Sequence, residues 1–275
     1  MSLDQATTSL PLELLYDIAD FLSDDALALH TCSVLSKAWR RGFQRRVFSS
    51  VFVFAHVQAH SLASFILFLD DCPDLASVIR EVHIQPRPGL PGLQERDPPL
   101  SYRELQAALD RLPPLRLLHI HYLNIAIGSS ENSSRNIPSS PSSPPKAVDM
   151  LQLAYVSIRA RGEIADGLSS ILRLFSSIDI LRLFTVEFTQ PAGDASPHPS
   201  TTAISVRKIE TFGVDSSALR DIAQCLDLPD LSSLHLMEVV KYSRHRFIEY
   251  QGMIQRSASL RSIELWIPYC KSSYS

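Results

Sequence analysis

Residues 115–120, LRLLHI, hold the pattern that decides the fold: two apolar residues separated by two positions, then a third apolar residue two positions further on. The pattern recurs along most of the chain, and consecutive copies start 25 to 36 residues apart. The copies begin at Phe48, Ile79, Leu115, Val148, Ile178, Val206, Leu231 and Leu260. In the sixth copy Thr211 takes the place of the third apolar residue. A recurrence of this length predicts a repeat architecture.

Most intervals between the copies contain a stretch with helical periodicity. These stretches are residues 58–69, 101–112, 162–175, 217–226 and 244–256. In the second of them Ser101 and Glu104 have the spacing of a capping box. Strand, turn and helix therefore alternate, which predicts an α/β fold.

The recurring pattern resembles the strand segment of leucine-rich repeats, although the asparagine of that repeat is missing. We therefore expect an irregular, leucine-rich-repeat-like solenoid, because one unit cannot bury its apolar strand face without neighbours. An ordinary α/β domain with a parallel sheet has the same periodicity and remains the alternative.

Three segments rich in proline or serine interrupt the pattern. They are residues 86–99, residues 129–146 (SSENSSRNIPSSPSSPPK) and residues 190–202. None of them contains enough apolar side chains to offset the entropy lost on ordering, so we expect flexible loops.

Residues 10–39, LPLELLYDIADFLSDDALALHTCSVLSKAW, precede the strands and predict three short helices. Pro11 suits the first turn of a helix, where a missing N–H costs nothing. Ser23 and Asp24 can end the first helix and cap the second, and Ser33 or Ser36 can open the third. The apolar stripe of the first helix comprises Leu14, Leu15, Ile18, Phe21 and Leu22. Three short helices cannot bury all their apolar side chains, so some must meet the rest of the chain or another protein.

The same region resembles an F-box. The resemblance rests on L-P-x-E-L at residues 10–14, Ile18, Leu22, D-D-x-L at residues 24–27 and C-S-V-L-S-K-A-W at residues 32–39. R-R-V-F-S-S-V at residues 45–51 is similar to the junction found in many fungal F-box proteins. The order Val34-Leu35 reverses the usual one, and both residues are apolar. An ordinary three-helix start to a globular fold is the alternative. We expect an F-box domain over residues 9–46 and a substrate-binding domain over residues 47–275.

The F-box resemblance implies a substrate-recruiting subunit of a Skp–cullin–F-box E3 ubiquitin ligase. Such a subunit binds a Skp-type adaptor, and through it a cullin, and it holds a target protein without being an enzyme. By the resemblance, the adaptor contacts would come from Leu10, Pro11, Leu14, Ile18, Leu22, Leu35 and Trp39. A repeat scaffold that binds a partner outside any ligase is the alternative function.

The strands predict a surface for the target protein. If the second and third apolar residues of each copy point into the core, the residue between them and the residue after them face the other way. From this face we expect target contacts by His119, His121, Arg182, Phe184, Phe212, Met237 and Trp266. Aromatic residues, methionine and arginine are typical of protein-binding surfaces. Packing of these side chains under loops or the C-terminal tail is the alternative.

Composition excludes several other classes of function. The net charge of −3 gives no reason to expect nucleic acid, and the four scattered cysteines indicate reduced thiols in a cytoplasmic or nuclear protein. No motif of a hydrolase, nucleotide-binding or zinc-protease site is present, so we expect no cofactor. His119 and His121 could share a face of one strand, but no further ligand cluster accompanies them, so we expect no metal.

Residues 47–69 lack charged side chains over a length that could span a membrane. Their periodicity changes midway from that of a strand to that of a helix, which predicts a strand followed by a helix and no membrane span.

Overall fold

The computed structural model describes most of the chain. The described residues are 10–22, 25–35, 37–55, 61–86, 99–127, 145–160, 167–189, 204–214, 218–219, 222–223, 226–237 and 244–266. The three segments expected to be flexible loops lie almost wholly outside them.

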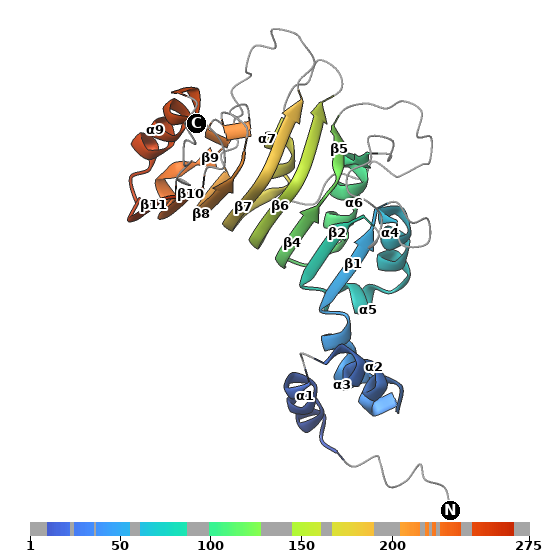
Figure 1. The fold of residues 1–275 in the computed structure, drawn as a ribbon. Helices are drawn as coiled ribbons and strands as arrows, with labels where there is room; N and C mark the ends of the chain where they lie inside the picture. The colour runs from blue at the N-terminus through green and yellow to red at the C-terminus, as the bar shows by residue number, and fades with distance from the viewer. Residues whose placement is uncertain are drawn as a thin grey trace, which may run out of the picture.

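Three helices stand at the N-terminus, set apart from the sheet in Figure 1. They are α1 (Leu12–Phe21), α2 (Ala26–Leu35) and α3 (Lys37–Val47). The helices enclose a small core of their own, made by Leu15, Ala19, Leu29 and Phe43. A Cβ added at Gly42 would stand 2.8 Å from the Cβ of Leu15, so glycine permits the close approach of α3 to α1.

The helix ends differ in detail from the expectation. Pro11 is the N-cap of α1 and not a residue of its first turn. The amide of Ala28 donates to Oδ1 of Asp25 at 2.9 Å, so the carboxylate of Asp25 caps α2. The expected caps, Ser23 and Asp24, lie outside the described residues, as does Ser36.

The rest of the chain builds one 11-stranded sheet whose ladders are all parallel among the described residues. Its strands are β1 (Ser50–Phe54), β2 (Glu81–Gln85), β3 (Leu100–Ser101), β4 (Leu115–His121), β5 (Asn124–Ile127), β6 (Lys146–Ala160), β7 (Phe175–Thr189), β8 (Ile204–Phe212), β9 (Leu226–Asp227), β10 (Ser233–Met237) and β11 (Ser262–Trp266). The main path runs β1-β2-β4-β6-β7-β8-β10-β11, which follows the order in the sequence.

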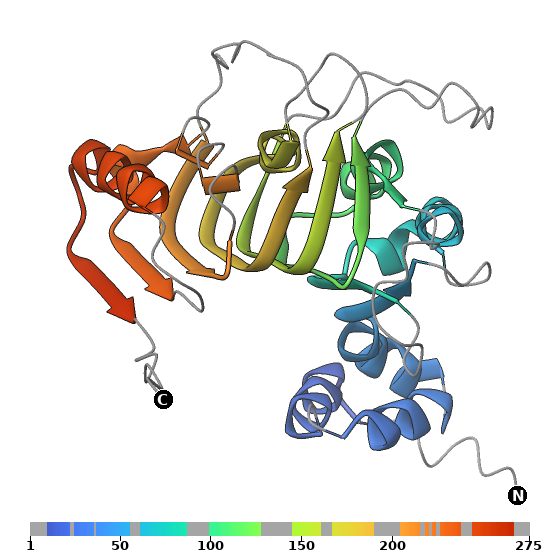
Figure 2. The ribbon, with the colours of Figure 1, turned by 45° about the horizontal axis from the view of Figure 1, so that its top comes forward.

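Helices cover one face of this sheet (Figures 1 and 2). They are α4 (Leu62–Asp71), α5 (Pro73–Ala76), α6 (Tyr102–Arg111), α7 (Gly167–Leu172) and α9 (Arg244–Arg256), with the short 3-10 helix η3 (Leu228–Asp230). Apolar residues of these helices, among them Leu62, Phe65 and Ile66 on α4 and Met253 on α9, join the strand residues in one large core.

The strand registers match the copies of the recurring pattern. The second apolar position aligns Val51, Val82, Leu118, Leu151, Leu181, Ile209, Leu234 and Ile263. The third aligns Val53, Ile84, Ile120, Leu153, Leu183, Thr211, Leu236 and Leu265. Most of the described side chains of both rows are buried, as the period-two alternation predicted.

The strands bend together at one row of residues with left-handed backbone conformation. The φ angles are 53° at Tyr122, 54° at Tyr155, 49° at Thr185 and 60° at Gly213. Tyr155 and Thr185 lie opposite each other, since Ala154 pairs with Phe184 and Val156 with Val186. Beyond the bend, β5 pairs with β3 and with the second half of β6.

The predicted fold, a three-helix F-box followed by an irregular leucine-rich-repeat-like solenoid, is wrong: the chain has an α/β fold built on one large parallel sheet. Its strands range from two to 15 residues, and the elements between them are unequal. The recurring pattern reports which strand residues are buried and how the strands align. An ordinary parallel sheet has the same buried positions and the same strand alignment without needing uniform repeats. The alternative, an ordinary α/β domain, is therefore the better description.

Two local expectations also need correction. Ser101 is the N-cap of α6, but its side chain makes no capping hydrogen bond. Lys146, expected at the end of a flexible loop, begins β6 instead.

Residues 47–69 hold the end of α3, β1 and the start of α4, as the change of periodicity predicted. Within the described ranges, no helix is both long enough and apolar enough to cross a membrane.

Candidate functional site

The face of the sheet opposite the helices is the candidate site, and we call it the open face. None of the described helices lies on it (Figures 1 and 2). Purely parallel sheets are usually covered on both faces, so an open face with half-buried side chains favours a surface that meets a partner. Its central row, one residue from each strand of the main path, comprises Phe52, His83, His119, Gln152, Arg182, Glu210, His235 and Glu264.

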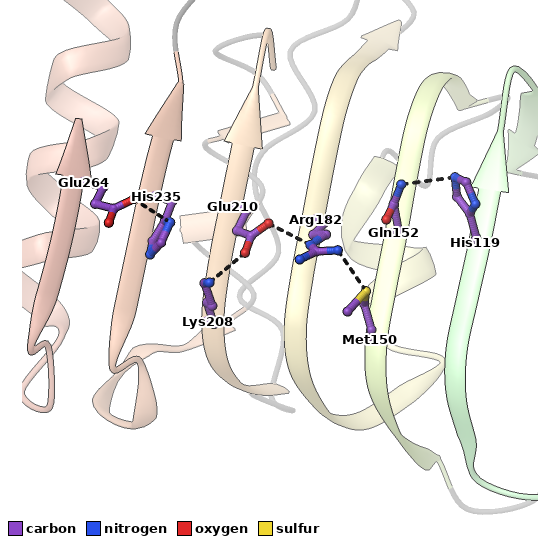
Figure 3. A network of polar contacts seen from close by, with 8 residues as sticks. All are labelled: His119, Met150, Gln152, Arg182, Lys208, Glu210, His235 and Glu264. Atoms are coloured by element: carbon purple, nitrogen blue, oxygen red, sulfur yellow. Dashed lines mark hydrogen bonds and ion pairs between the residues drawn. The ribbon is translucent and has the colours of Figure 1, made fainter. Parts of the chain in front are cut away.

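A charged cluster occupies the middle of the open face (Figure 3). Nε of Arg182 donates to Oε2 of Glu210 at 2.7 Å, and Nζ of Lys208 lies 2.8 Å from Oε1 of the same carboxylate. Nη1 of Arg182 lies 3.4 Å from the sulfur of Met150, a weak acceptor. Two cations therefore share one carboxylate, and the cluster carries a net charge of +1.

The carboxylate of this cluster is held in its charged form. Burial raises the pKa of Glu210, but the hydrogen bonds from Lys208 and Arg182 outweigh that effect and lower it. The side chains of Arg182 and Glu210 are only 33% and 19% exposed, so the pair is partly shielded from water.

A strip of aromatic and imidazole rings lies beside the charged cluster, and we call it the ring strip. It comprises Phe52, His83, His119, His121, Tyr122 and Tyr155. Neighbouring rings of the strip lie 4.0 to 5.8 Å apart between centroids. Gln152 lies between the strip and the cluster: its Nε2 lies 3.2 Å from Nε2 of His119, and the register places it opposite Arg182 (Figure 3).

The imidazoles of the ring strip are neutral at pH 7. Burial, with smaller effects from His121 and His83, lowers the pKa of His119 to about 4. Burial also lowers the pKa values of His83 and His121. The ring strip is therefore an uncharged surface of planar groups, next to a cluster with a positive charge.

Sequence reasoning missed the two tyrosines of the ring strip. Tyr122 and Tyr155 stack with centroids 4.6 Å apart and planes 11° from parallel. Both have positive φ, which is costly for a residue with a bulky side chain, whereas Gly213 occupies the same row of the bend at little cost. Thr185 shares this conformation without a ring, so the bend imposes the positive φ, and the two tyrosines place a stacked pair of rings at the bend. The only signal in the sequence is that each tyrosine directly follows an outward-facing strand residue.

The remaining predicted target residues lie on the row after the central one. Phe184 and Phe212 are adjacent, with ring centroids 6.3 Å apart. The register places Met237 and Trp266 next in this row, but their side chains lie outside the described part of the structure. His121 stands at the other end, so the sheet brings the predicted target residues onto one face.

The seven residues predicted to contact an adaptor lie on the N-terminal helices or at the ends of α1, and they divide into two groups. Leu10, Pro11, Leu14 and Leu35 are exposed, with Leu14 at 47% and Leu35 at 62%. Ile18, Leu22 and Trp39 are partly buried against the helical core. Trp39 stacks on Phe43 at 5.3 Å between centroids, so its ring supports the core. Three further exposed apolar residues, Phe21, Leu27 and Val34, were not predicted as contacts.

The described residues contain no group of three or more histidine, cysteine, aspartate or glutamate side chains arranged to hold a metal ion. A small cavity of about 110 Å³ lies between α6, the start of β6 and the residues that follow α7, beside Tyr102, Lys146 and Arg173. Nζ of Lys146 donates to backbone carbonyls around the end of α6, so the lysine has a structural role there.

No protein-family model matches this chain, and no curated protein matches it.

Proposed function

We propose that this chain is a substrate-recruiting subunit of a Skp–cullin–F-box E3 ubiquitin ligase. The N-terminal helices would bind a Skp-type adaptor, and the open face would hold a target protein. The resemblance of residues 9–54 to an F-box supports this proposal. The exposed apolar side chains on α1 and α2 carry it, because they would otherwise face water.

The helices offer a surface suited to a stable complex. Such interfaces bury roughly 800 Å² on each partner and depend on a few well-placed apolar anchors. Leu10, Leu14 and Leu35 belong to the predicted adaptor set and are exposed. Phe21 and Leu27 add apolar surface on the same helices.

The chain would act by positioning and not by chemistry of its own. Holding a target close to the ligase raises the effective concentration of its lysines at the catalytic subunit. The proposal assigns the protein to the cytoplasm or nucleus, where such ligases work.

Exposed residues make the sharpest test of adaptor binding, since Trp39 also supports the helical core. Replacing Leu14→Ser together with Leu35→Ser removes two exposed apolar side chains without opening a cavity. We expect the full-length double variant to lose co-purification with a co-expressed Skp-type adaptor. Leu67→Ser is the matched control, because Leu67 is 64% exposed on α4, outside the N-terminal helices. The control should bind the adaptor like the wild type.

Two results would count against the ligase assignment. One is undiminished adaptor binding by the Leu14 and Leu35 double variant. The other is a wild-type chain that is folded by circular dichroism and still fails to co-purify with the adaptor. The second result would favour the alternative, a protein-interaction scaffold that works outside any ligase.

A further inference from the structure

We propose that the open face recognises an extended segment in which an acidic and an aromatic side chain point to the same side. The acidic side chain would meet Arg182 and Lys208, and the aromatic one would pack on the ring strip. This inference rests on the proposed role of the open face in holding a target protein.

The positive charge of the open face favours an acidic residue in the bound segment. Arg182, Lys208 and Glu210 together carry a charge of +1 at the middle of the face. One N–H of Arg182 points to the sulfur of Met150, and a carboxylate is a much better acceptor than a thioether. A partner carboxylate can therefore improve on the contact that Arg182 makes in the free protein.

The surroundings of the cluster strengthen this attraction. Arg182 is two-thirds buried. Phe184 lies two residues after it on β7, and Phe212 lies two residues after Glu210 on β8. A charged hydrogen bond is stronger where water is partly excluded. Arginine and aromatic residues are also enriched at protein interfaces.

The ring strip favours an aromatic residue in the bound segment. Its imidazoles are neutral at pH 7, so an apolar ring can stack on them without displacing the water of a charged group. Tyr122 and Tyr155 present stacked rings in a strained backbone conformation, which is typical of binding sites.

The distance between the charged cluster and the ring strip determines how far apart the acidic and aromatic residues of the segment should be. Arg182 on β7 and His119 on β4 are separated by β6, so two strand spacings of about 4.8 Å place them about 10 Å apart. An extended chain rises about 3.3 Å per residue and alternates its sides. A separation of about 10 Å lies between the spans of two and four residues, about 6.6 and 13 Å, which are the nearest spacings that keep both side chains on one side. Acidic and aromatic residues two or four positions apart would therefore reach both parts, with their side chains leaning outward or inward by a few ångströms.

Three fluorescein-labelled peptides test this inference by fluorescence anisotropy with the full-length chain. The first repeats Glu-Ser-Phe-Ser, which puts Glu and Phe on one side of an extended chain. The second repeats Glu-Phe-Ser-Ser, which has the same composition with the two on opposite sides. The third repeats Gln-Ser-Phe-Ser and lacks the charge. We expect the first peptide to bind about tenfold more tightly than either of the others, the effect of one well-formed contact.

Variants of the chain assign the contacts. Arg182→Met should weaken binding of the first peptide about tenfold and leave the third unchanged. Glu210→Gln should strengthen binding of the first peptide, because it removes the internal competitor for Arg182 and Lys208. Tyr155→Asn removes a ring while tolerating positive φ, and it should weaken the first and third peptides alike. Arg207→Gln is the control, because Arg207 neighbours Lys208 on β8 but pairs with Asp179.

The opposite effects of Arg182→Met and Glu210→Gln separate recognition from stability, since breaking one ion pair would destabilise the chain in both cases. Thermal unfolding of each variant confirms that it is folded at the assay temperature. Equal binding of the three peptides, no binding of any, or indifference to Arg182→Met would overturn the inference. Adaptor co-purification should be unaffected by all four variants, so failure here is distinguishable from failure of the ligase assignment.

Discussion

At the scale of single residues, Thr211 is the one departure from the apolar row that it shares with Leu183 and Leu236. It is 3% exposed, and its hydroxyl has no hydrogen-bond partner within the described part of the chain. Burying an unpaired hydroxyl costs about 1–3 kcal/mol. Thr211→Val keeps the shape and removes the hydroxyl, so it should stabilise the protein by about 1 kcal/mol in urea unfolding.

Thr211→Ser is the matched control for this substitution. It keeps the hydroxyl and removes a buried methyl group, so it should destabilise the protein by about 1 kcal/mol. A valine variant less stable than the wild type would mean that the hydroxyl is hydrogen-bonded after all.

The sequence predicted the outward rows of the open face because period-two alternation places them without further information. His119, Arg182 and Phe184 therefore stand where the pattern put them. The pairing of Arg182 with Glu210 depends on which strands are neighbours, and the pattern alone did not establish it. The bend at Tyr122 and Tyr155 was not predictable from residue type, because positive φ is usually indicated by glycine.

At the scale of elements, Lys146 joins β6 to the end of α6. Its Nζ donates to the carbonyl oxygens of Leu109 at 3.0 Å and Asp110 at 2.8 Å, and also to that of Leu112. These carbonyls lie at the end of the helix, where backbone donors become scarce, although the carbonyl of Leu109 also accepts from the amide of Leu112 at 3.2 Å. Lys146→Met keeps most of the apolar stem and removes the ammonium group. We expect a loss of about 1–3 kcal/mol in stability and faster amide exchange in the last turn of α6.

Lys37→Met is the control, because Lys37 is an exposed lysine on α3. It should change stability by less than about 0.5 kcal/mol. Unchanged exchange in α6 of the Lys146 variant would show that water replaces the ammonium at no cost.

Elements were easier to predict than their assembly. The helices over residues 62–71 and 102–111 coincide closely with predicted stretches, because their apolar residues recur at helical spacing. The assembly depends on the lengths of the strands and on the bend, and neither is encoded by the recurring pattern. β6 and β7 extend to 15 residues each, past the end of their copies. The solenoid expectation failed for this reason.

At the scale of the whole molecule, the buried apolar residues that the structure describes form two separate sets. The larger set joins the sheet to its helices, and the smaller one lies among α1, α2 and α3. A small core has a low free energy of unfolding, because it buries few side chains. The proposed adaptor surface depends on the smaller core and the proposed target surface on the larger one. We therefore expect that a substitution can unfold one of these surfaces and leave the other folded.

Phe43→Ala tests this independence. Phe43 is fully buried at the centre of the helical core and stacks on Trp39. Its removal costs about 3–5 kcal/mol, a large loss for a core in which four of the described residues are buried. In hydrogen exchange followed by mass spectrometry, we expect α1, α2 and α3 to lose protection while β4, β6 and β7 keep theirs. Leu118→Ala, in the larger core, should have the opposite pattern, with faster exchange in the sheet. Faster exchange in the sheet of the Phe43 variant would mean that the two cores unfold as one unit, and adaptor and target binding would then be lost together.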